Sequence, residues 1–239
     1  MYSPALLQLL NNWPNEVDAL LALGDEEFYW EVEHAVDAQF HQSSWHPHEA
    51  SWVAADADRV LNRMSSGWFD RAEPASPQAR YLDPANLEMR DTGTMPPSRL
   101  NAEKPERGMW TASFFPSGRT TWDHGETRFR HLERVLCSLQ FDDTHVSSYA
   151  IHSLEDFAEL VRRFPAPGSE GRIRVDWTSV ARHFDAVHLT AKGLITADRV
   201  PVSTTHGIAE LWGWGSQSTV WFNVPPGLRV HATSRVENA

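Results

Sequence analysis

Aromatic and hydroxyl side chains alternate in the segment Gly108–Ser113, which reads Gly-Met-Trp-Thr-Ala-Ser. If this segment is a strand, Trp110 lies on one face, and Thr111 and Ser113 lie on the other. Hydroxyl groups that share a face can hold a backbone or a ribose, and an indole ring offers a flat surface for stacking. A second tryptophan, Trp122, follows after a short turn. A half-buried strand without a ligand explains the same pattern, so both interpretations stay open.

A second tryptophan-rich segment, residues 212–221, reads Trp-Gly-Trp-Gly-Ser-Gln-Ser-Thr-Val-Trp. Its glycines allow a close backbone approach or a positive φ, and Trp214 offers another stacking surface. Gln217 follows where a loop gives way to an expected strand, which is a common place for a ligand. An aromatic-rich turn packed on the core is the alternative interpretation.

Histidines suggest two further possibilities. His188 lies in the alternating segment 185–190, where it is either a hydrogen-bonded core residue or a ligand contact. A histidine-rich cluster has the residue types of a zinc site without a fixed spacing. This cluster consists of His34, His41, His46, His48 and Glu49. We expect no metal, and we keep a histidine-dependent metal hydrolase as an alternative.

Strong catalytic signatures are missing from the sequence. It contains no phosphate-binding glycine loop, no H-E-x-x-H and no G-x-S-x-G motif. Its one cysteine, Cys137, excludes an internal disulfide. No apolar run approaches the roughly 18–20 residues of a membrane span, and no signal peptide is recognisable. We therefore expect a cytoplasmic protein that does not associate with membranes.

The segment Gly108–Ser113, followed by Trp122, resembles a strand of the ADP-ribosyltransferases. In that family an aromatic residue follows a glycine at the start of a strand, a small hydroxyl residue comes next, and a second aromatic residue lies further on. The segment 215–221 sits where the family has its catalytic glutamate. The resemblance covers residues 108–239. It implies a domain that binds NAD as a substrate and transfers ADP-ribose to an unknown macromolecular acceptor, as bacterial toxins and effectors of the family do.

The resemblance also implies roles for individual residues. Trp110 and Trp122 stack on the nicotinamide, and Thr111 and Ser113 support its ribose. The family's first strand supplies a histidine or arginine, and the cationic candidates for phosphate binding here are Arg99, Lys104 and Arg107. The complete predicted NAD-binding set is Arg107, Trp110, Thr111, Ser113, Trp122, His188 and Trp214.

Gln217 takes the place of the catalytic glutamate in this resemblance. A glutamine can donate or accept a hydrogen bond at the ribose 2′-hydroxyl, but it has no negative charge for the oxocarbenium-like transition state. Such electrostatic contributions are often worth several kcal/mol. Either another carboxylate serves, of which Glu210 is the nearest in the sequence, or the protein binds NAD without efficient turnover. The predicted catalytic residues are therefore Gln217 and Glu210.

Negative charge is concentrated in the first third of the chain. Residues 1–70 hold 12 acidic and two basic residues, so nearly all of the formal net charge of −11 lies there. This charge argues against nucleic-acid binding by that region, because phosphates attract lysine and arginine. A solvated helical surface is one interpretation. A non-catalytic interaction module that docks a basic protein partner on the acidic helices is another.

Periodicity and turn residues predict three regions. Residues 1–70 form an acidic helical region, with a short helix capped by Asn15 that runs through Leu23, a second helix from Asp25 onward and a third over about 49–64. Residues 71–107 contain six prolines and form a connector. Residues 108–239 form a mixed, mainly antiparallel sheet with short helices, so the fold class is α+β. Expected strands are 109–115, 145–151, 172–176 and a half-buried strand 185–190, with helices from Ser153 and Trp177, and a hairpin joining 220–224 to 228–232.

Overall fold

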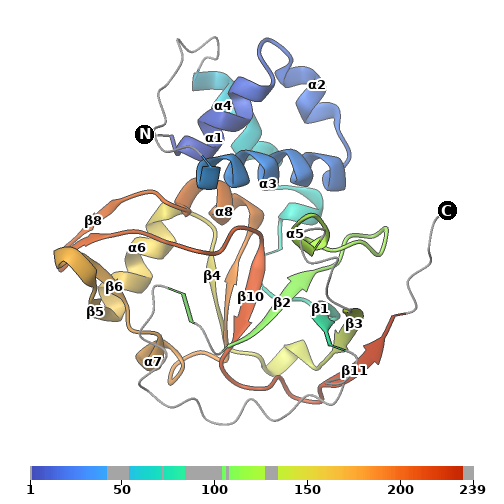
Figure 1. Cartoon of the computed structure of the whole chain (residues 1–239), viewed down its shortest axis with the longest axis vertical. Coiled ribbons are helices and arrows are strands. Elements are labelled where there is room, and N and C mark those ends of the chain that lie inside the picture. The colour runs from blue at the N-terminus through green and yellow to red at the C-terminus, as the bar shows by residue number, and fades with distance from the viewer. Residues whose placement is uncertain are drawn as a thin grey trace. The chain divides into compact units, whose positions relative to one another are not determined.

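The computed structural model of the chain describes residues 2–41, 54–71, 73–83, 104–105, 108–126 and 134–233. Within these residues the chain forms helices and a mixed β-sheet, which confirms the predicted α+β class (Figure 1). None of the helices described there is both long enough and apolar enough to cross a bilayer.

The chain divides into two compact units whose segments alternate along the sequence. Unit 1 consists of Met1–Ala72, Ala150–Val175 and Leu189–Ser216. Unit 2 consists of Glu73–Tyr149, Asp176–His188 and Gln217–Ala239. The first segment of unit 1 ends close to the predicted boundary at residue 70, and the predicted region 108–239 contributes to both units. The organisation expected from composition, 1–70, 71–107 and 108–239, stays a prediction.

The acidic first third forms helices of unit 1. They are α1 (Pro4–Asn12), α2 (Val17–Ala22), α3 (Asp25–His41) and α4 (Ala54–Arg63). α1 was not predicted, and its N-terminus is capped by Ser3, whose Oγ accepts a hydrogen bond from the Leu6 N–H at 3.1 Å. α3 begins at Asp25 as expected. α2 begins later than expected, because Asn15 adopts a φ of 63°, a left-handed conformation that asparagine tolerates.

The two basic residues described in this region are bonded to acidic ones. Arg59 pairs with Asp18, and Arg63 pairs with Asp25. Residues 49–53 of the helix predicted over about 49–64 lie outside the described residues. Docking of a basic partner on the acidic helices stays a prediction.

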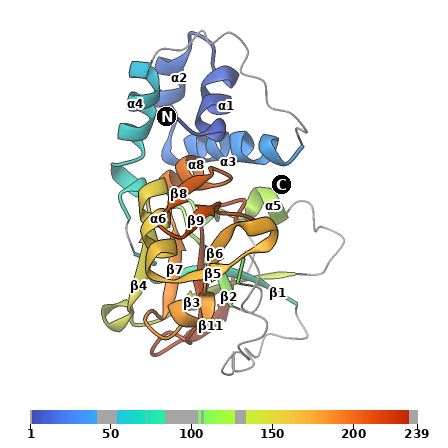
Figure 2. The ribbon, with the colours of Figure 1, turned by 90° about the vertical axis from the view of Figure 1, so that its left-hand side faces the viewer.

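The later segments of unit 1 contain helices and short hairpins. α6 (Leu154–Arg163) begins where predicted, since the Ser153 Oγ accepts a hydrogen bond from the Asp156 N–H at 3.2 Å. α8 (Ala191–Ala197) is capped by Thr190 and was not predicted. Two hairpins lie beside α6 in Figure 2. They are β5 (Pro165–Pro167) with β6 (Ile173–Val175), and β8 (Val202–Thr204) with β9 (Gly207–Ala209).

Seven strands form one sheet in the order β11-β3-β1-β2-β10-β7-β4. They are β1 (Gln78–Leu82), β2 (Met109–Ser113), β3 (Val135–Gln140), β4 (Ser148–Ile151), β7 (Ala186–Leu189), β10 (Ser218–Trp221) and β11 (Arg229–Ala232). The pairs β1·β2, β1·β3, β2·β10 and β3·β11 are antiparallel. The N–H groups of Asp185 and Thr190 donate to the carbonyls of Ser147 and Ile151 at 2.7 and 3.2 Å, so β4 and β7 run parallel. The sheet is therefore mixed and mainly antiparallel, as predicted.

Strand β1 corrects the prediction that residues 71–107 form only a connector. Gln78–Leu82 lies in the middle of the sheet, between β2 and β3. Pro77 lies just before the strand, where its missing N–H does not interrupt the ladder. The strand carries Gln78 and Arg80 on one face, so its alternation contains too few apolar residues to stand out from the surrounding prolines.

The predicted hairpin near the C-terminus is wrong. β10 pairs with β2, whereas β11 pairs with β3 at the edge of the sheet. All four residues of β10 are buried, while β11 is mostly exposed. A strand that is buried along its whole length lies inside a sheet, with a strand on each side. β10 therefore lies inside the sheet, whereas the exposed β11 lies at its edge.

Three local predictions also need correction. β7 is buried along its whole length rather than half-buried, because it lies between β10 and β4 inside the sheet. β4 is shorter than expected, since residues 143–145 form a 3-10 turn before it. A short helix, α5 (Asp123–Glu126), follows β2 where none was predicted, whereas the helix expected from Trp177 is present as α7 (Trp177–Val180).

Candidate functional site

Polar side chains gather on one face of four neighbouring strands of unit 2. Gln78 of β1 lies opposite Ser113 of β2, and Thr219 of β10 lies opposite Thr111 of β2. Because alternate residues of a strand share a face, these side chains point to the same side of the sheet. We call this set the polar strip. It consists of Gln78, Arg80, Thr111, Ser113, His188, Gln217 and Thr219.

Gln217 and Ser113, which were predicted separately, meet in the polar strip. The Gln217 Nε2 donates a hydrogen bond to the Ser113 Oγ at 3.1 Å. Thr121 ties the two backbones together, since its Oγ1 donates to the Gln217 carbonyl at 2.9 Å and its N–H donates to the Ser113 carbonyl at 3.0 Å. Gln217 is 4% exposed and Ser113 is half-buried. The sheet therefore holds an amide and a hydroxyl in one fixed arrangement.

The centre of the polar strip is a buried hydrogen-bond network around Thr111. The Trp221 Nε1 donates to the Thr111 Oγ1 at 2.9 Å, and the Thr111 hydroxyl is bonded in turn to the Gln78 Oε1. Beside it, the His188 Nδ1 lies 2.8 Å from the Thr219 Oγ1. Thr111 is 0% exposed and His188 is 1% exposed. Both residues thus fix the strands to one another, and their predicted contacts with NAD stay a prediction.

Arg80 is the basic residue of the polar strip, and sequence reasoning missed it. It is half-buried on β1, opposite Cys137 of β3. Burial lowers the pKa of the Arg80 guanidinium from its ordinary value, and the neighbouring Cys137 acts in the opposite direction. Among the described residues no carboxylate forms an ion pair with Arg80. Gln78 lies two residues before Arg80 on the same face of β1, and its buried Nε2 has no hydrogen-bond acceptor among the described residues. A half-buried guanidinium that forms no ion pair with the described carboxylates suits an anion.

Cys137 is expected to react slowly with thiol reagents in the folded chain. Burial raises the pKa of its thiol, and the Arg80 charge offsets this only in part. Because the thiolate is the reactive form, alkylation by iodoacetamide at about pH 8 should be at least about tenfold slower than in the urea-unfolded chain. Equal rates in the folded and unfolded chains contradict this.

The same raised pKa makes stability depend on pH. The unfolded chain loses the thiol proton first, so the free energy of unfolding should fall as pH rises above about 8.5, the ordinary thiol pKa. Urea denaturation across this range measures the effect, and the variant Cys137→Ala should lack this contribution.

The tryptophans of the predicted nicotinamide sandwich are not in the polar strip. Trp110 alternates with Thr111 along β2, so its side chain projects from the face of the sheet opposite the polar strip. Its Nε1 donates to the Pro105 carbonyl at 3.0 Å, and the Lys104 Nζ lies 4.2 Å from its ring centroid. The Trp122 Nε1 donates to the Ser218 Oγ at 2.8 Å, and Ser218 alternates with Gln217 and Thr219. Both indoles therefore lie toward the face opposite the strip.

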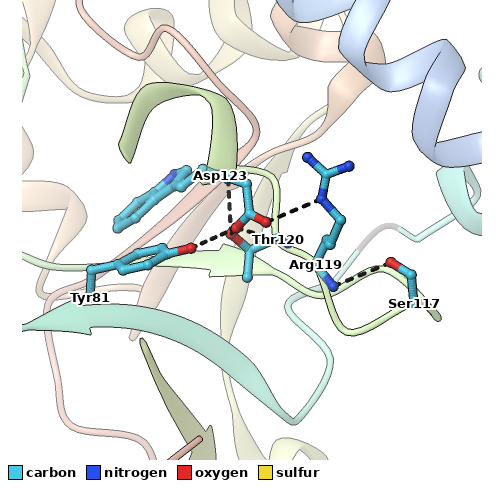
Figure 3. Close-up of polar contacts among 6 residues, drawn as sticks. Tyr81, Ser117, Arg119, Thr120 and Asp123 are labelled. Carbon is cyan, nitrogen blue, oxygen red and sulfur yellow. Dashed lines mark hydrogen bonds and ion pairs between the residues drawn. The ribbon is translucent and has the colours of Figure 1, made fainter. Parts of the chain in front are cut away.

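A carboxylate that the sequence did not single out lies next to Trp122. Figure 3 shows Asp123 with its polar neighbours. The Tyr81 hydroxyl and the Thr120 Oγ1 each donate to the Asp123 Oδ1 at 2.6 Å, and the Arg119 Nε lies 3.4 Å from the Oδ2. Thr120 also accepts a hydrogen bond from the Trp122 N–H at 3.2 Å. Asp123 therefore fixes the turn that carries Trp122 to β1, through Tyr81.

Replacing Tyr81 with phenylalanine should destabilise the chain by about 1 kcal/mol, because Asp123 is only 17% exposed and loses a donor. The variant Tyr2→Phe is the matched control. Tyr2 also donates to an aspartate, Asp58, but on an exposed surface where such a bond contributes little. Urea denaturation of both variants measures the difference, and equal losses of stability contradict the prediction.

The remaining predicted residues lie elsewhere. Glu210 and Trp214 belong to unit 1, where Glu210 forms an ion pair with Arg172 at 2.7 Å and Trp214 is buried. Arg107 and Arg99 lie outside the described residues. So do His46, His48, Glu49 and the side chain of His41, and the metal alternative therefore stays a prediction.

Comparison with known proteins adds no assignment. No protein-family model, curated protein or solved structure matches the chain. The chemistry of unit 2 therefore stands on its own residues. They are a half-buried guanidinium, a buried amide and hydroxyl, and a network that holds the strands in register.

Proposed function

We propose that unit 2 is an ADP-ribosyltransferase-like domain that binds NAD on the polar strip. One observation carries this proposal. The adjacent strands β1 and β2 direct Arg80 and Ser113 to one face, and Gln217, the residue just before β10, is hydrogen-bonded to Ser113 on that face. These are the residue types that the resemblance requires: an arginine on the first strand, a small hydroxyl residue on the next, and a residue in the place of the glutamate on a later strand.

The chemistry of each group suits part of the dinucleotide. A guanidinium binds phosphate oxygens through two parallel hydrogen bonds, so Arg80 is assigned to the pyrophosphate. Ser113 and Gln217 carry hydroxyl and amide groups, which can donate to and accept from ribose hydroxyls. The predicted stacking of nicotinamide between Trp110 and Trp122 forms no part of this proposal, because the Trp110 side chain projects from the face opposite the polar strip.

Titration calorimetry of the full chain with NAD tests the proposal. We expect saturable binding at NAD concentrations up to about 1 mM, the range typical of enzyme substrates. The variant Ser113→Ala should weaken binding several-fold, whereas Thr144→Ala, which changes an exposed threonine of unit 2, should not. An absence of heat and of any change in tryptophan fluorescence over this range would refute NAD binding.

A further inference from the structure

Cleavage of NAD makes a specific electrostatic demand on a binding site. The bond between the ribose C1′ and the nicotinamide nitrogen breaks, and its electron pair leaves with the nicotinamide, which departs neutral. The ribose is left as an oxocarbenium ion, which an oxygen of water or of an acceptor captures with loss of a proton. Enzymes that cleave glycosidic bonds through such ions use carboxylates to stabilise the positive charge.

The polar strip presents the opposite electrostatics. Its charged group is the cation Arg80, and the group bonded to Ser113 is the neutral amide of Gln217. The Gln217 Nε2 donates its hydrogen bond, so the amide directs the positive end of its dipole at the Ser113 hydroxyl. Such a surface attracts the phosphates of a dinucleotide, but it offers no negative charge to stabilise the positive charge as that charge moves from the nicotinamide ring to the ribose.

Two carboxylates of unit 2 that lie close in the sequence to the described strands are engaged elsewhere, and Asp83, directly after β1, is exposed. Asp123 is held by Tyr81 and Thr120, next to the turn that carries Trp122. Asp185 accepts hydrogen bonds from the Ser147 N–H at 3.0 Å and from the Asn223 Nδ2 at 2.9 Å. Asp123 and Asp185 therefore each have a structural task in the sheet or its turns.

From these observations we infer that the chain holds NAD intact and does not cleave it, so that unit 2 is a reader of the dinucleotide rather than a transferase. This inference rests on the proposed function. Gln217 is the residue that prevents cleavage of the bound NAD. A carboxylate in its place would lie within hydrogen-bond distance of Ser113 and would partly neutralise the field of Arg80.

The test measures binding and cleavage on the same samples. The full chain is saturated with NAD, binding is followed by calorimetry, and released nicotinamide is quantified by chromatography. We expect the wild type to bind NAD and to release nicotinamide no faster than a protein-free blank. Release clearly above the blank by the wild type overturns the inference but leaves NAD binding intact. Failure to bind NAD overturns the proposed function itself.

The variant Gln217→Glu tests the cause. We expect it to release nicotinamide at least about tenfold faster than the wild type. A single group that stabilises charge in the transition state commonly changes a reaction rate by that much or more. Calorimetry on this variant verifies that it still folds and binds NAD. The matched control is Gln140→Glu, which places the same charge at an exposed position of β3. Equal release by the two variants, with NAD still bound, overturns the role of Gln217.

Discussion

Replacing Arg80 with leucine is expected to weaken NAD binding at least about tenfold, because hydrogen bonds from a charged donor contribute about 1.5–3 kcal/mol. The same variant should be as stable as the wild type or more stable. Arg80 is half-buried, its pKa is lowered by burial, and no carboxylate among the described residues pairs with it. Removing such a charge relieves a desolvation penalty, and leucine can pack beside Cys137.

The two readouts together separate a ligand-binding arginine from a structural one. Calorimetry with NAD measures affinity, and urea denaturation measures stability. Arg80→Lys keeps the charge but loses the planar fork, so its affinity should lie between those of the wild type and Arg80→Leu. Arg182→Leu, at an exposed position of unit 2, should change neither quantity. A loss of stability in Arg80→Leu with unchanged NAD binding would show that the guanidinium is structural.

Elements with strong local signals were predictable from the sequence. The helix after Ser153 has a capping serine, an acidic residue at the third position and an apolar stripe, and these features act within a few residues of each other. β2 has alternating aromatic and small residues after a glycine. Such features do not depend on which other strands are nearby, so the structure retains them.

Elements whose identity depends on distant partners were not predictable. β1 has Gln78 and Arg80 on one face, and their burial is possible only because β2 and β3 flank them. β10 and β11 are separated in the sheet because β10 pairs with β2 and β11 pairs with β3. The turn residues between β10 and β11 carry no information about these distant partners. Residues 71–107 were predicted to form a connector because β1, a polar strand among prolines, lacks the regular alternation of apolar residues that indicates a strand.

The candidate site shows the same division. Ser113 and Gln217 were each identified from local patterns, but their hydrogen bond joins residues 104 positions apart. Arg80 was missed because its strand was missed. Trp110 and Trp122 were assigned to the nicotinamide through the family resemblance, whereas the alternation along β2 places Trp110 on the opposite face of the sheet from Thr111.

Replacing Thr111 with valine is expected to destabilise the chain by about 2–4 kcal/mol, because each buried polar group left without a partner costs about 1–3 kcal/mol. Valine keeps the shape of threonine but removes the oxygen that the Trp221 Nε1 donates to and that is bonded to the Gln78 Oε1. All three residues are almost completely buried, so water cannot replace the lost partner.

The loss of stability should come from breaking the buried network and not from the exchange of threonine for valine as such. Thr144→Val makes the same change at an exposed threonine bonded to Asp142, and it should alter stability by less than about 1 kcal/mol. Trp221→Phe removes only the indole donor, and Thr111→Val combined with Trp221→Phe should cost less than the sum of the two single changes, because the two groups satisfy each other. Urea denaturation of the four variants measures these values. Strict additivity would mean that the hydroxyl and the indole do not depend on each other.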